Sequence, residues 1–503
     1  MNEDKAVIEV LVRRIDELVQ QIEKLERELA ELREENTQLR AENAAKDIVI
    51  AKQAARIKEL EEKLNKNSQN SSKPPSSDGY KKPHPVSNRE KTGKKPGAQP
   101  GHKGSGFKMP DPDVIQDVPH IPEKCLGCPN LGKCEKVDTS PIRNEVDVEI
   151  QVVLRRHYTE SYACPMQGGI VLRGEFPEGI NSSMQYGPGV KSLAATLNTE
   201  GMMSVQRTHE FLSAALGLPV SVGTISAMVH ELAVQVRPAV QAVFQVLMCF
   251  PVNNADETGF RVEGAVYWLH SVCNALFTCL SVQRHRGEEG MRAIGFLPEY
   301  RGVLVTDCLS SYWKFPQLSH AICNAHILRE LKGIAENNPE QTWAGELRDL
   351  LREMDHCRNE AMRSKELPLS VEKVEEYEHR YDEILDKAAK ANPIPDRKPG
   401  QRGKTPKGKV RSLIDRLRDH KKEALAFLTN SQIPFTNNLA EQSVRMAKVK
   451  GKVSGCLRTV SGANDFAAVM SFIGSVKKHG INVLSAVKSA FSGDAYGVLF
   501  PAL

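Results

Sequence analysis

The stretch Phe250-Pro-Val-Asn-Asn-Ala-Asp-Glu-Thr-Gly-Phe260 decides the fold of this chain, because an apolar run ends there on the acidic pair Asp256 and Glu257. Two later segments also carry an acid at a comparable place. Asp307 closes the apolar run 302–307, and Glu441 lies in the segment 434–445, after two asparagines that can cap a helix. We therefore expect Asp256 and Asp307 at the ends of strands and Glu441 on a helix.

Three carboxylates that converge from two strands and a helix can bind divalent cations. Hard ions such as Mg²⁺ take oxygen ligands, and two such ions activate a nucleophile and stabilise a leaving oxygen in phosphoryl transfer. Glu257 could replace one ligand, but we expect its side chain on the face of the strand opposite Asp256. The alternative interpretation is that the acids are solvated residues that cap strands and helices.

The acidic segments resemble those of bacterial insertion-sequence transposases of the family numbered sixty-six. Five stretches, spread over most of the chain, carry this resemblance: Ala255-Asp-Glu-Thr258, Val305-Thr-Asp307, Asn437-Asn-Leu-Ala-Glu441, Lys73-Pro-Pro-Ser-Ser-Asp-Gly79 and Pro96-Gly-Ala-Gln-Pro-Gly-His-Lys-Gly104. Together these motifs are specific.

The resemblance implies a DNA transposase of the three-carboxylate (DDE) type with a ribonuclease-H-like catalytic domain. Asp256, Asp307 and Glu441 would hold Mg²⁺ or Mn²⁺ while water cleaves a phosphodiester at an element end and the freed 3′-hydroxyl attacks target DNA. The partners would be double-stranded DNA, as element ends and target, and accessory proteins of the same element. Two alternatives stay open: a nuclease that only hydrolyses DNA, and a catalytically silent dimeric DNA-binding protein that represses or bridges DNA.

Length and composition favour a multidomain protein without a membrane span, and the segments described below together predict a fold class that mixes α+β and α/β parts. A chain of 503 residues is too long for one core. Charged residues make up 26%, mean hydropathy is −0.40, and no run of about 18 apolar residues occurs. We expect no secretory signal, and the eleven cysteines fit reduced cytosolic thiols. The family resemblance implies the bacterial cytoplasm, in association with the nucleoid.

Residues 1–65 are predicted to form a coiled coil. Apolar residues recur at alternating steps of three and four: Ile8, Leu11, Ile15, Leu18, Ile22, Leu25, Leu29, Leu32, Leu39, Ile50, Ile57 and Leu60. Asn36 and Asn43 take a positions of the heptad, where a buried amide fixes register and favours a dimer. We expect a parallel homodimer; pairing with another coiled-coil protein is the alternative.

Residues 66–109 are predicted to be a flexible basic linker, because Pro, Gly, Ser and Asn dominate there. Such a segment contacts phosphates without reading bases. Lys94 and Lys95 are its candidate DNA-binding residues, and a linker that merely keeps the chain soluble is the alternative.

Residues 110–180 are predicted to be a small zinc-finger-like module. The thiols of Cys125, Cys128, Cys134 and Cys164 have a spacing that suits one tetrahedral, structural Zn²⁺. The family that the chain resembles usually has two Cys-x-x-Cys pairs here, whereas Cys164 has no second cysteine after it and Cys134 takes that place. His157 is a competing ligand, and a metal-free module is the alternative.

Residues 185–240 are predicted to be helical. A helix, a break at Gly217-Leu-Pro219 and a second helix after Ser221 fit a helix-turn-helix that binds DNA. An ordinary helical hairpin fits the same pattern.

Residues 248–338 and 431–465 are predicted to form the catalytic domain. Two antiparallel strands should follow the Asp256 strand, and a helix near 288–294 should lead to the parallel strand that ends at Asp307, as in a ribonuclease-H-like mixed sheet. A later strand ends at Cys323. The pair Cys323-x-x-His326 resembles an element found after the second acid in several transposase families, which makes His326 a candidate catalytic residue. A core cysteine beside a satisfied histidine is the alternative.

Two helical segments complete the prediction. Residues 339–430 are expected to be an α-helical insertion whose basic residues hold DNA beside the site, with a solvated pair of surface helices as the alternative. Residues 466–503 are expected to be a helical tail packed on the catalytic sheet. Basic residues after Glu441 are candidate DNA contacts or members of a surface ion-pair ladder: Arg445, Lys448, Lys450 and Arg458.

Overall fold

A computed structural model describes residues 2–67, 69–71, 115–118, 120–135, 143–148, 150–164, 166, 170–366, 368–394 and 407–501. The chain divides into two compact units. The first unit comprises residues 1–84 and 240–448, and the second comprises 85–239 and 449–503. Lys94, Lys95 and the motifs at 73–79 and 96–104 lie outside the described residues.

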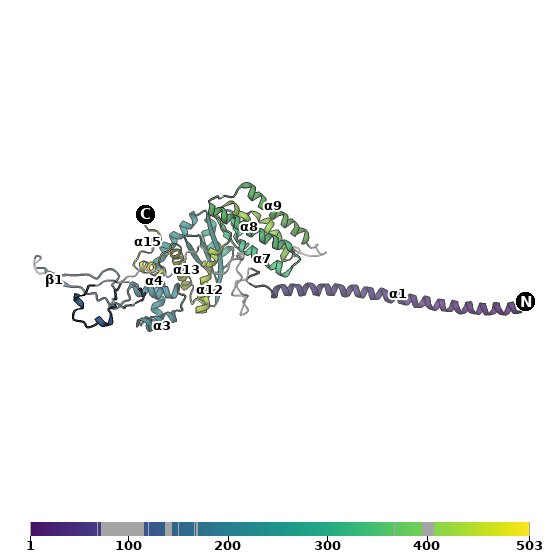
Figure 1. Cartoon of the computed structure of the whole chain (residues 1–503), viewed down its shortest axis with the longest axis horizontal. Coiled ribbons are helices and arrows are strands. Elements are labelled where there is room, and N and C mark those ends of the chain that lie inside the picture. Colours follow the sequence, from purple (N-terminus) through teal and green to yellow (C-terminus); the bar gives the residue numbers. More distant parts are fainter. Residues whose placement is uncertain are drawn as a thin grey trace. The chain divides into compact units, whose positions relative to one another are not determined.

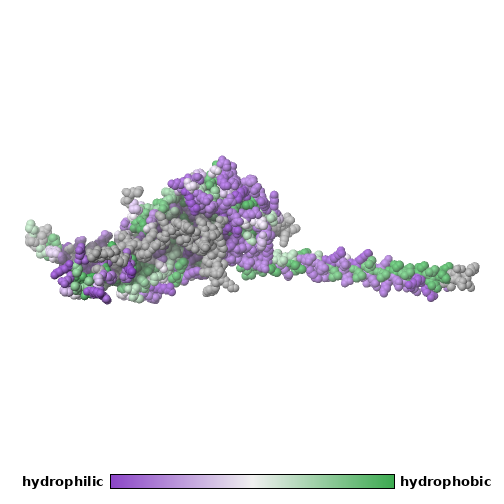
Figure 2. All heavy atoms as spheres, in the orientation of Figure 1, coloured by the Kyte–Doolittle hydropathy of each residue, from purple (hydrophilic) through white to green (hydrophobic). Residues whose placement is uncertain are grey.

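The N-terminal segment is one uninterrupted helix, α1 (Asn2–Leu64) (Figure 1). Its 63 residues span about 95 Å at 1.5 Å per residue. The apolar residues of the predicted seam face solvent, with Leu25 and Leu32 each 62% exposed. Figure 2 shows green hydrophobic residues interleaved with purple hydrophilic ones along α1. The helix is as predicted, and its exposed apolar seam is what a coiled-coil strand presents to a partner.

The segment after α1 packs against helix α7 (Asn324–Asn337) of the first unit. Asn70 and Ser71 are buried, and the Asn70 amide donates to Glu336 Oε2 at 3.0 Å. The Asn70 carbonyl oxygen also lies where a Cβ on Gly333 would stand, 2.3 Å from that position. The start of the predicted flexible linker is therefore a docked segment, because its asparagine side chain and backbone fit a glycine on the helix.

The first unit contains a five-stranded mixed sheet in the order β5-β4-β3-β6-β7. Its strands are β3 (Val252–Val262), β4 (Ala265–Cys273), β5 (Thr278–Gln283), β6 (Val303–Thr306) and β7 (Ser319–Ile322). β3, β4 and β5 are antiparallel neighbours, whereas β3, β6 and β7 are parallel. The predicted antiparallel meander and the adjacent parallel strand are confirmed.

Helices surround this sheet in the chain order that the sequence indicated. They are α5 (Glu288–Ile294), α6 (Phe296–Glu299), α7, α8 (Thr342–Ser364), α9 (Val371–Ala391), α10 (Gly408–Asp419) and α11 (Lys421–Thr429). One hydrophobic core joins α7–α11 to β6 and β7, with Trp343, Tyr377 and Tyr381 among its buried side chains. Figure 1 shows α7, α8 and α9 side by side in this layer. The insertion is therefore packed on the sheet and is not a pair of solvated helices.

Most described basic residues of the insertion form ion pairs within the first unit. Arg416 pairs with Glu330 at 2.6 Å, and Lys421 lies 2.8 Å from Asp382. Further ion pairs at the end of the insertion are Lys407–Asp415, Lys409–Glu62, Arg411–Asp415 and Arg418–Asp386. Since these cations already face carboxylates, the basic run at the end of the insertion supplies less free positive charge than its composition suggests.

The described part of the second unit contains helices, one short hairpin and stretches without regular secondary structure. Its elements are η2 (Glu123–Cys125), η3 (Leu131–Lys133), β1 (Ser161–Cys164), β2 (Ile170–Arg173), α2 (Pro188–Thr199), α3 (Val205–Leu216), the start of α4 (Val222–Cys249), the end of α12 (Asn438–Ser454), α13 (Val460–Lys478), α14 (Val483–Phe491) and α15 (Ala495–Leu499). α3 ends at Gly217, whose φ of +62° is the left-handed conformation of a helix C-cap. The predicted helices at 185–240 are present.

The C-terminal helices of the second unit pack on one another. α13, α14 and α15 contact each other, and α13 and α14 also contact α2. The division between the two units falls at Lys448, inside α12. The expectation that residues 466–503 pack on the catalytic sheet stays a prediction.

Among the described helices, α4 is the one that is long and apolar enough to cross a membrane. Core helices of water-exposed folds meet the same test, and α4 buries Ile225 and Leu232. Its charged residue Glu231 pairs with Lys191, and Arg237 pairs with Asp465, at 2.6 and 2.7 Å. These contacts indicate a packed helix.

We expect Gly333→Ala to release the segment 69–71 from α7, because the new Cβ would overlap the Asn70 carbonyl. Hydrogen exchange should then lose the protection of these amides. Gly345→Ala in α8 is the matched control: it makes the same change of helix propensity, and its Cβ would meet nothing within 4 Å. Equal protection in both variants would contradict the docking.

Candidate active site

The register of the sheet brings Asp256 and Asp307 side by side. Asn254 on β3 pairs with Val305 on β6, so the two acids each lie two residues beyond the last matched pair. Neighbouring strands lie about 4.8 Å apart. Asp307 follows the end of β6, as predicted, but Asp256 lies in the middle of β3 and not at a strand end. The strand continues past the acids because β4 pairs with it as far as Val262.

Glu257 is occupied by structural contacts. Tyr312 donates its hydroxyl to Glu257 Oε2 at 2.7 Å, and Arg286 Nε donates to Oε1 at 2.9 Å. The Glu257 side chain is fully buried. These contacts connect β3 to the segment after Asp307 and to the end of β5, and they commit the Glu257 carboxylate to holding the sheet together.

Asp256 is a carboxyl group that resists ionisation. Burial, together with the nearby carboxylates of Glu257, Asp307 and Glu441, raises its pKa to about 8. The backbone N–H of Glu257 donates to Asp256 Oδ1 at 2.9 Å and opposes this shift only in part. A cation at this position would remove the repulsion that keeps the group protonated.

Asn437 fixes the start of α12 against β3. Its side-chain N–H donates to the Ala255 carbonyl at 2.8 Å, and its Oδ1 accepts from the Asn254 side chain at 2.8 Å. Its backbone N–H donates to Cys323 Sγ at 3.1 Å. We expected this residue to cap the helix; its backbone carbonyl accepts from Glu441 N–H, but its side chain binds the strand. The fully buried amide therefore ties Glu441 to the region of Asp256.

Glu441 faces helix α7 and not the basic residues of its own helix. Its Oε1 lies 3.7 Å from His326 Nδ1 and 3.7 Å from an Arg329 guanidinium nitrogen. Sequence reasoning missed Arg329, although its spacing of three from His326 places both on one helical face. Burial, then Arg329, lowers the pKa of His326, which favours the neutral imidazole.

The carboxylates of Asp256, Asp307 and Glu441 do not all lie within 4.8 Å of one another. Among the described residues, that criterion is met by a different group of three possible ligands, which also includes Glu441. A two-metal site does not require that approach, because its ions lie about 4 Å apart and different carboxylates bind different ions.

Asp307 Oδ1 accepts from Leu309 N–H at 3.1 Å, and Cys308 between them has a φ of +70°. This unfavourable conformation for a non-glycine residue turns the chain sharply after Asp307.

The candidate DNA-binding residues have different environments. Lys450 is 6% exposed, and its ammonium donates to the carbonyls of Asn198 and Met203 at 2.6 and 3.0 Å. Burial lowers its pKa to about 8. It therefore binds carbonyls at the end of α2, and its prediction as a DNA contact is wrong. Arg445 and Arg458 are exposed and Lys448 is half-buried, without ion pairs to described residues.

The predicted zinc ligands are only partly described. Cys125, Cys128 and Cys134 flank two short 3₁₀ turns, while the side chain of Cys164 lies outside the described residues. The three described thiols do not form a group of converging ligand atoms, and Cys134 Sγ instead contacts the Asn130 carbonyl. The zinc site stays a prediction.

We expect Asn437→Ala to destabilise the first unit, by about 1–3 kcal/mol for each buried group left without a partner. The affected groups are the Asn254 amide and the Ala255 carbonyl. Denaturant unfolding measures the loss. The exposed neighbour Asn438→Ala is the control, and equal stability of the two variants would refute the role of Asn437.

We expect Asp256→Asn to stabilise the metal-free protein at alkaline pH. The folded-state pKa of about 8 exceeds the ordinary 3.8, so the stability from the protonated group is complete below pH 3.8 and is lost as pH rises through 8. In chelator at pH 8.5 the variant should melt a few degrees above the wild type. At pH 4 the difference should vanish. The exposed Asp349→Asn should show no such pH dependence, and a constant difference for Asp256→Asn would count against the buried charge.

Comparison with protein-family models gives two matches. Residues 25–108 match a family of unknown function, DUF6444. Residues 183–465, more than half of the chain, match the model described as Transposase IS66 family, and this range contains Asp256, Asp307 and Glu441. A comparison with curated proteins found no match. Because this match covers more than half of the chain and includes the whole five-stranded sheet, the chain belongs to the IS66 transposase family.

Proposed function

We propose that this chain cleaves the ends of an insertion sequence and joins them to target DNA by two-metal phosphoryl transfer. Family membership supports the transposase role. The observation that carries the chemistry is the β3–β6 register, which aligns Asp256 with Asp307 while Asn437 ties the helix of Glu441 to the same strand. We assign the mixed sheet to the ribonuclease-H-like fold on its strand order.

The donor set fits hard divalent cations. Asp256, Asp307 and Glu441 offer only oxygen ligands, the preference of Mg²⁺ and Mn²⁺. The raised pKa of Asp256 supports this, since buried like charges call for a cation. When bound, such ions supply a nucleophilic water at neutral pH and neutralise charge on the leaving oxygen.

The protein's own groups orient the reaction. The three carboxylates would hold the ions beside the end of the β3–β6 pairing, and the neutral imidazole of His326 lies beside Glu441, where it can contact the scissile phosphate. Water would attack the phosphorus at an element end, and the 3′-oxygen would leave with a proton. The freed 3′-hydroxyl would then attack a target phosphodiester, whose own 3′-oxygen leaves with the proton of the attacking hydroxyl. The exposed Arg445 and Arg458 and the half-buried Lys448 are assigned to phosphates, which predicts salt-dependent binding.

Further assignments rest on sequence alone. They are a structural zinc in the module at 110–180, DNA binding by α3 and α4 as a helix-turn-helix, accessory proteins of the same element, and a cytoplasmic, nucleoid-associated location. Of the alternatives, a purely hydrolytic nuclease would cleave without joining, and a silent repressor would do neither.

Single Asp256→Asn, Asp307→Asn and Glu441→Gln variants should abolish cleavage and joining, by a factor of at least about 10³, because each removes a metal ligand. Binding of an element-end duplex should change little. Glu288→Gln, on the surface helix α5, is the control and should keep full activity. Strand transfer retained by any of the three variants would overturn the assignment.

We also propose that α1 forms a parallel homodimer, which brings two catalytic units to the two element ends and raises their effective concentration. The exposed seam supports this. Replacing Leu25 and Leu32 with Lys in the full chain should give monomers in sedimentation experiments, because charges at d positions disrupt the seam. Gln20→Lys with Glu34→Lys, on the opposite side of the heptad, should stay dimeric. A monomeric wild type at micromolar concentration would exclude self-pairing.

A further inference from the structure

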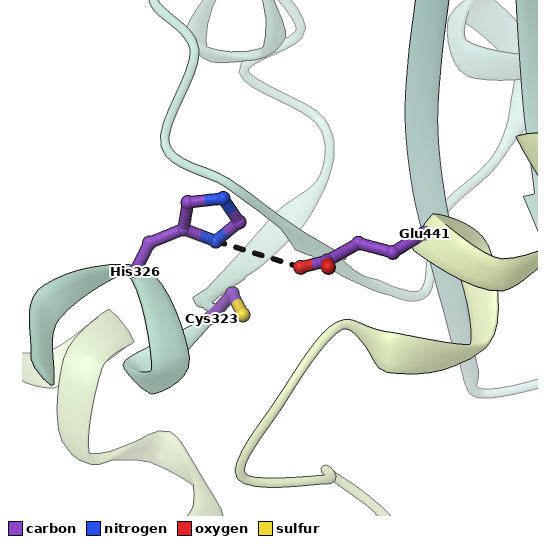
Figure 3. A group of neighbouring side chains, drawn as sticks. All are labelled: Cys323, His326 and Glu441. Carbon is purple, nitrogen blue, oxygen red and sulfur yellow. Dashed lines mark ion pairs between the residues drawn. The ribbon is translucent and has the colours of Figure 1, made fainter. Parts of the chain in front are cut away.

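Three possible metal ligands of different chemistry converge beside the acidic residues. Cys323 ends the β7 segment, His326 lies in the first turn of α7, and Glu441 projects from α12 (Figure 3). The Cys323 sulfur, an imidazole nitrogen of His326 and a carboxylate oxygen of Glu441 all lie within 4.8 Å of one another. Figure 3 shows the imidazole and the carboxylate pointing toward each other, with the sulfur beside them.

Two of these donor atoms are buried without a hydrogen-bond partner among the described residues: His326 Nδ1 and Glu441 Oε1. Leaving such an atom unsatisfied is unfavourable, so a ligand that contacts both atoms would remove this cost. Their separation is 3.7 Å. Donor atoms in a tetrahedral zinc site lie roughly 3.3–3.8 Å apart, given bonds of about 2.0–2.3 Å. These two atoms already have that spacing, and a small rotation of Cys323 would complete the set.

Backbone donors near Cys323 favour its thiolate form, whereas burial raises the pKa of this thiol to about 11. The Asn437 N–H donates to Cys323 Sγ at 3.1 Å, and such a bond stabilises a sulfur that carries negative charge. His326 is held in place because its own N–H donates to the Cys323 carbonyl. Backbone hydrogen bonds therefore hold both the Cys323 thiol and the helical turn that carries His326.

The ligand set selects the cation. Sulfur, imidazole nitrogen and carboxylate oxygen together suit Zn²⁺ and similar thiophilic ions, whereas Mg²⁺ takes oxygen ligands in an octahedral arrangement. Three protein ligands leave one tetrahedral position for water. Arg329, 3.7 Å from Glu441 Oε1, must move aside, and its side chain is partly exposed.

We propose that Cys323, His326 and Glu441 form a second metal site for a thiophilic divalent cation, and that this site shares Glu441 with the magnesium ligands. A cation bound there draws the Glu441 carboxylate toward Cys323 and away from Asp256 and Asp307. Zinc is therefore an inhibitor of magnesium-dependent cleavage, acting at a site separate from the cysteines at 125–164. Binding at this site is tested without any activity, whereas its inhibitory effect rests on the proposed function.

Titration of the full-length protein with Co²⁺ tests the site through its thiolate charge-transfer absorption. Wild type should bind one more equivalent of Co²⁺ than Cys323→Ser and should show a charge-transfer absorption that this variant lacks. Cys279→Ser, a control at another buried thiol of the same sheet, should bind Co²⁺ and absorb like wild type. His326→Gln, which keeps the thiol, should weaken Co²⁺ binding at this site at least about tenfold. The module cysteines contribute equally to all four spectra.

Zinc inhibition gives the second readout. With each protein normalised to its own zinc-free magnesium rate, Zn²⁺ should inhibit wild type and Cys279→Ser at concentrations at least about tenfold lower than Cys323→Ser. Equal Co²⁺ stoichiometry and spectra in wild type and Cys323→Ser would overturn the site. Loss of the Co²⁺ difference would refute this inference alone, whereas absent strand transfer with the Co²⁺ difference intact would refute the proposed function alone.

Discussion

The candidate site depends on the buried side chain of Asn437. Its amide is the contact that holds α12 against β3, through the Ala255 carbonyl and the Asn254 side chain. Its backbone also binds Cys323 Sγ, so one residue joins the central strand, the entry to α7 and the helix of Glu441. The chain separates Asn437 from Asn254 by 183 residues. Without this bridge, nothing in the local sequence of α12 would direct Glu441 toward the acids of the sheet.

Asp256 and Glu257 have different environments, because successive side chains of a strand point to opposite faces of the sheet. Glu257 faces Tyr312 and Arg286, which satisfy both of its oxygens. Asp256 has one backbone donor and three nearby carboxylates, so the folded protein holds it in its protonated form near neutral pH. The fold therefore stabilises Glu257 with its own arginine, whereas Asp256 has no ion pair with any described residue.

Fewer lysines and arginines of this chain are free to contact DNA than their number in the sequence suggests. The described arginines and lysines near the end of the insertion pair with acids of α7, α9 and α10, and Lys450 is buried on backbone carbonyls. A count of basic residues therefore overestimates the surface that could bind DNA. Several of these side chains already form ion pairs within the helices that pack on β6 and β7. The exposed Arg445 and Arg458 are thus better candidates for phosphate contacts than the insertion run.

The sequence determined the elements and the order in which they occur. Alternating and apolar runs predicted β3, β4, β5 and β6, the heptad pattern predicted α1, and the acidic motifs predicted family membership. These are local patterns, in which each residue reports on its neighbours along the chain. The pairing of His326 and Arg329 with Glu441, the burial of Lys450, the docking of Asn70 on Gly333 and the placement of the C-terminal helices were decided only by tertiary structure. Each of them joins residues far apart in sequence, and a residue's own pattern shows that it is buried or charged without identifying the group it meets.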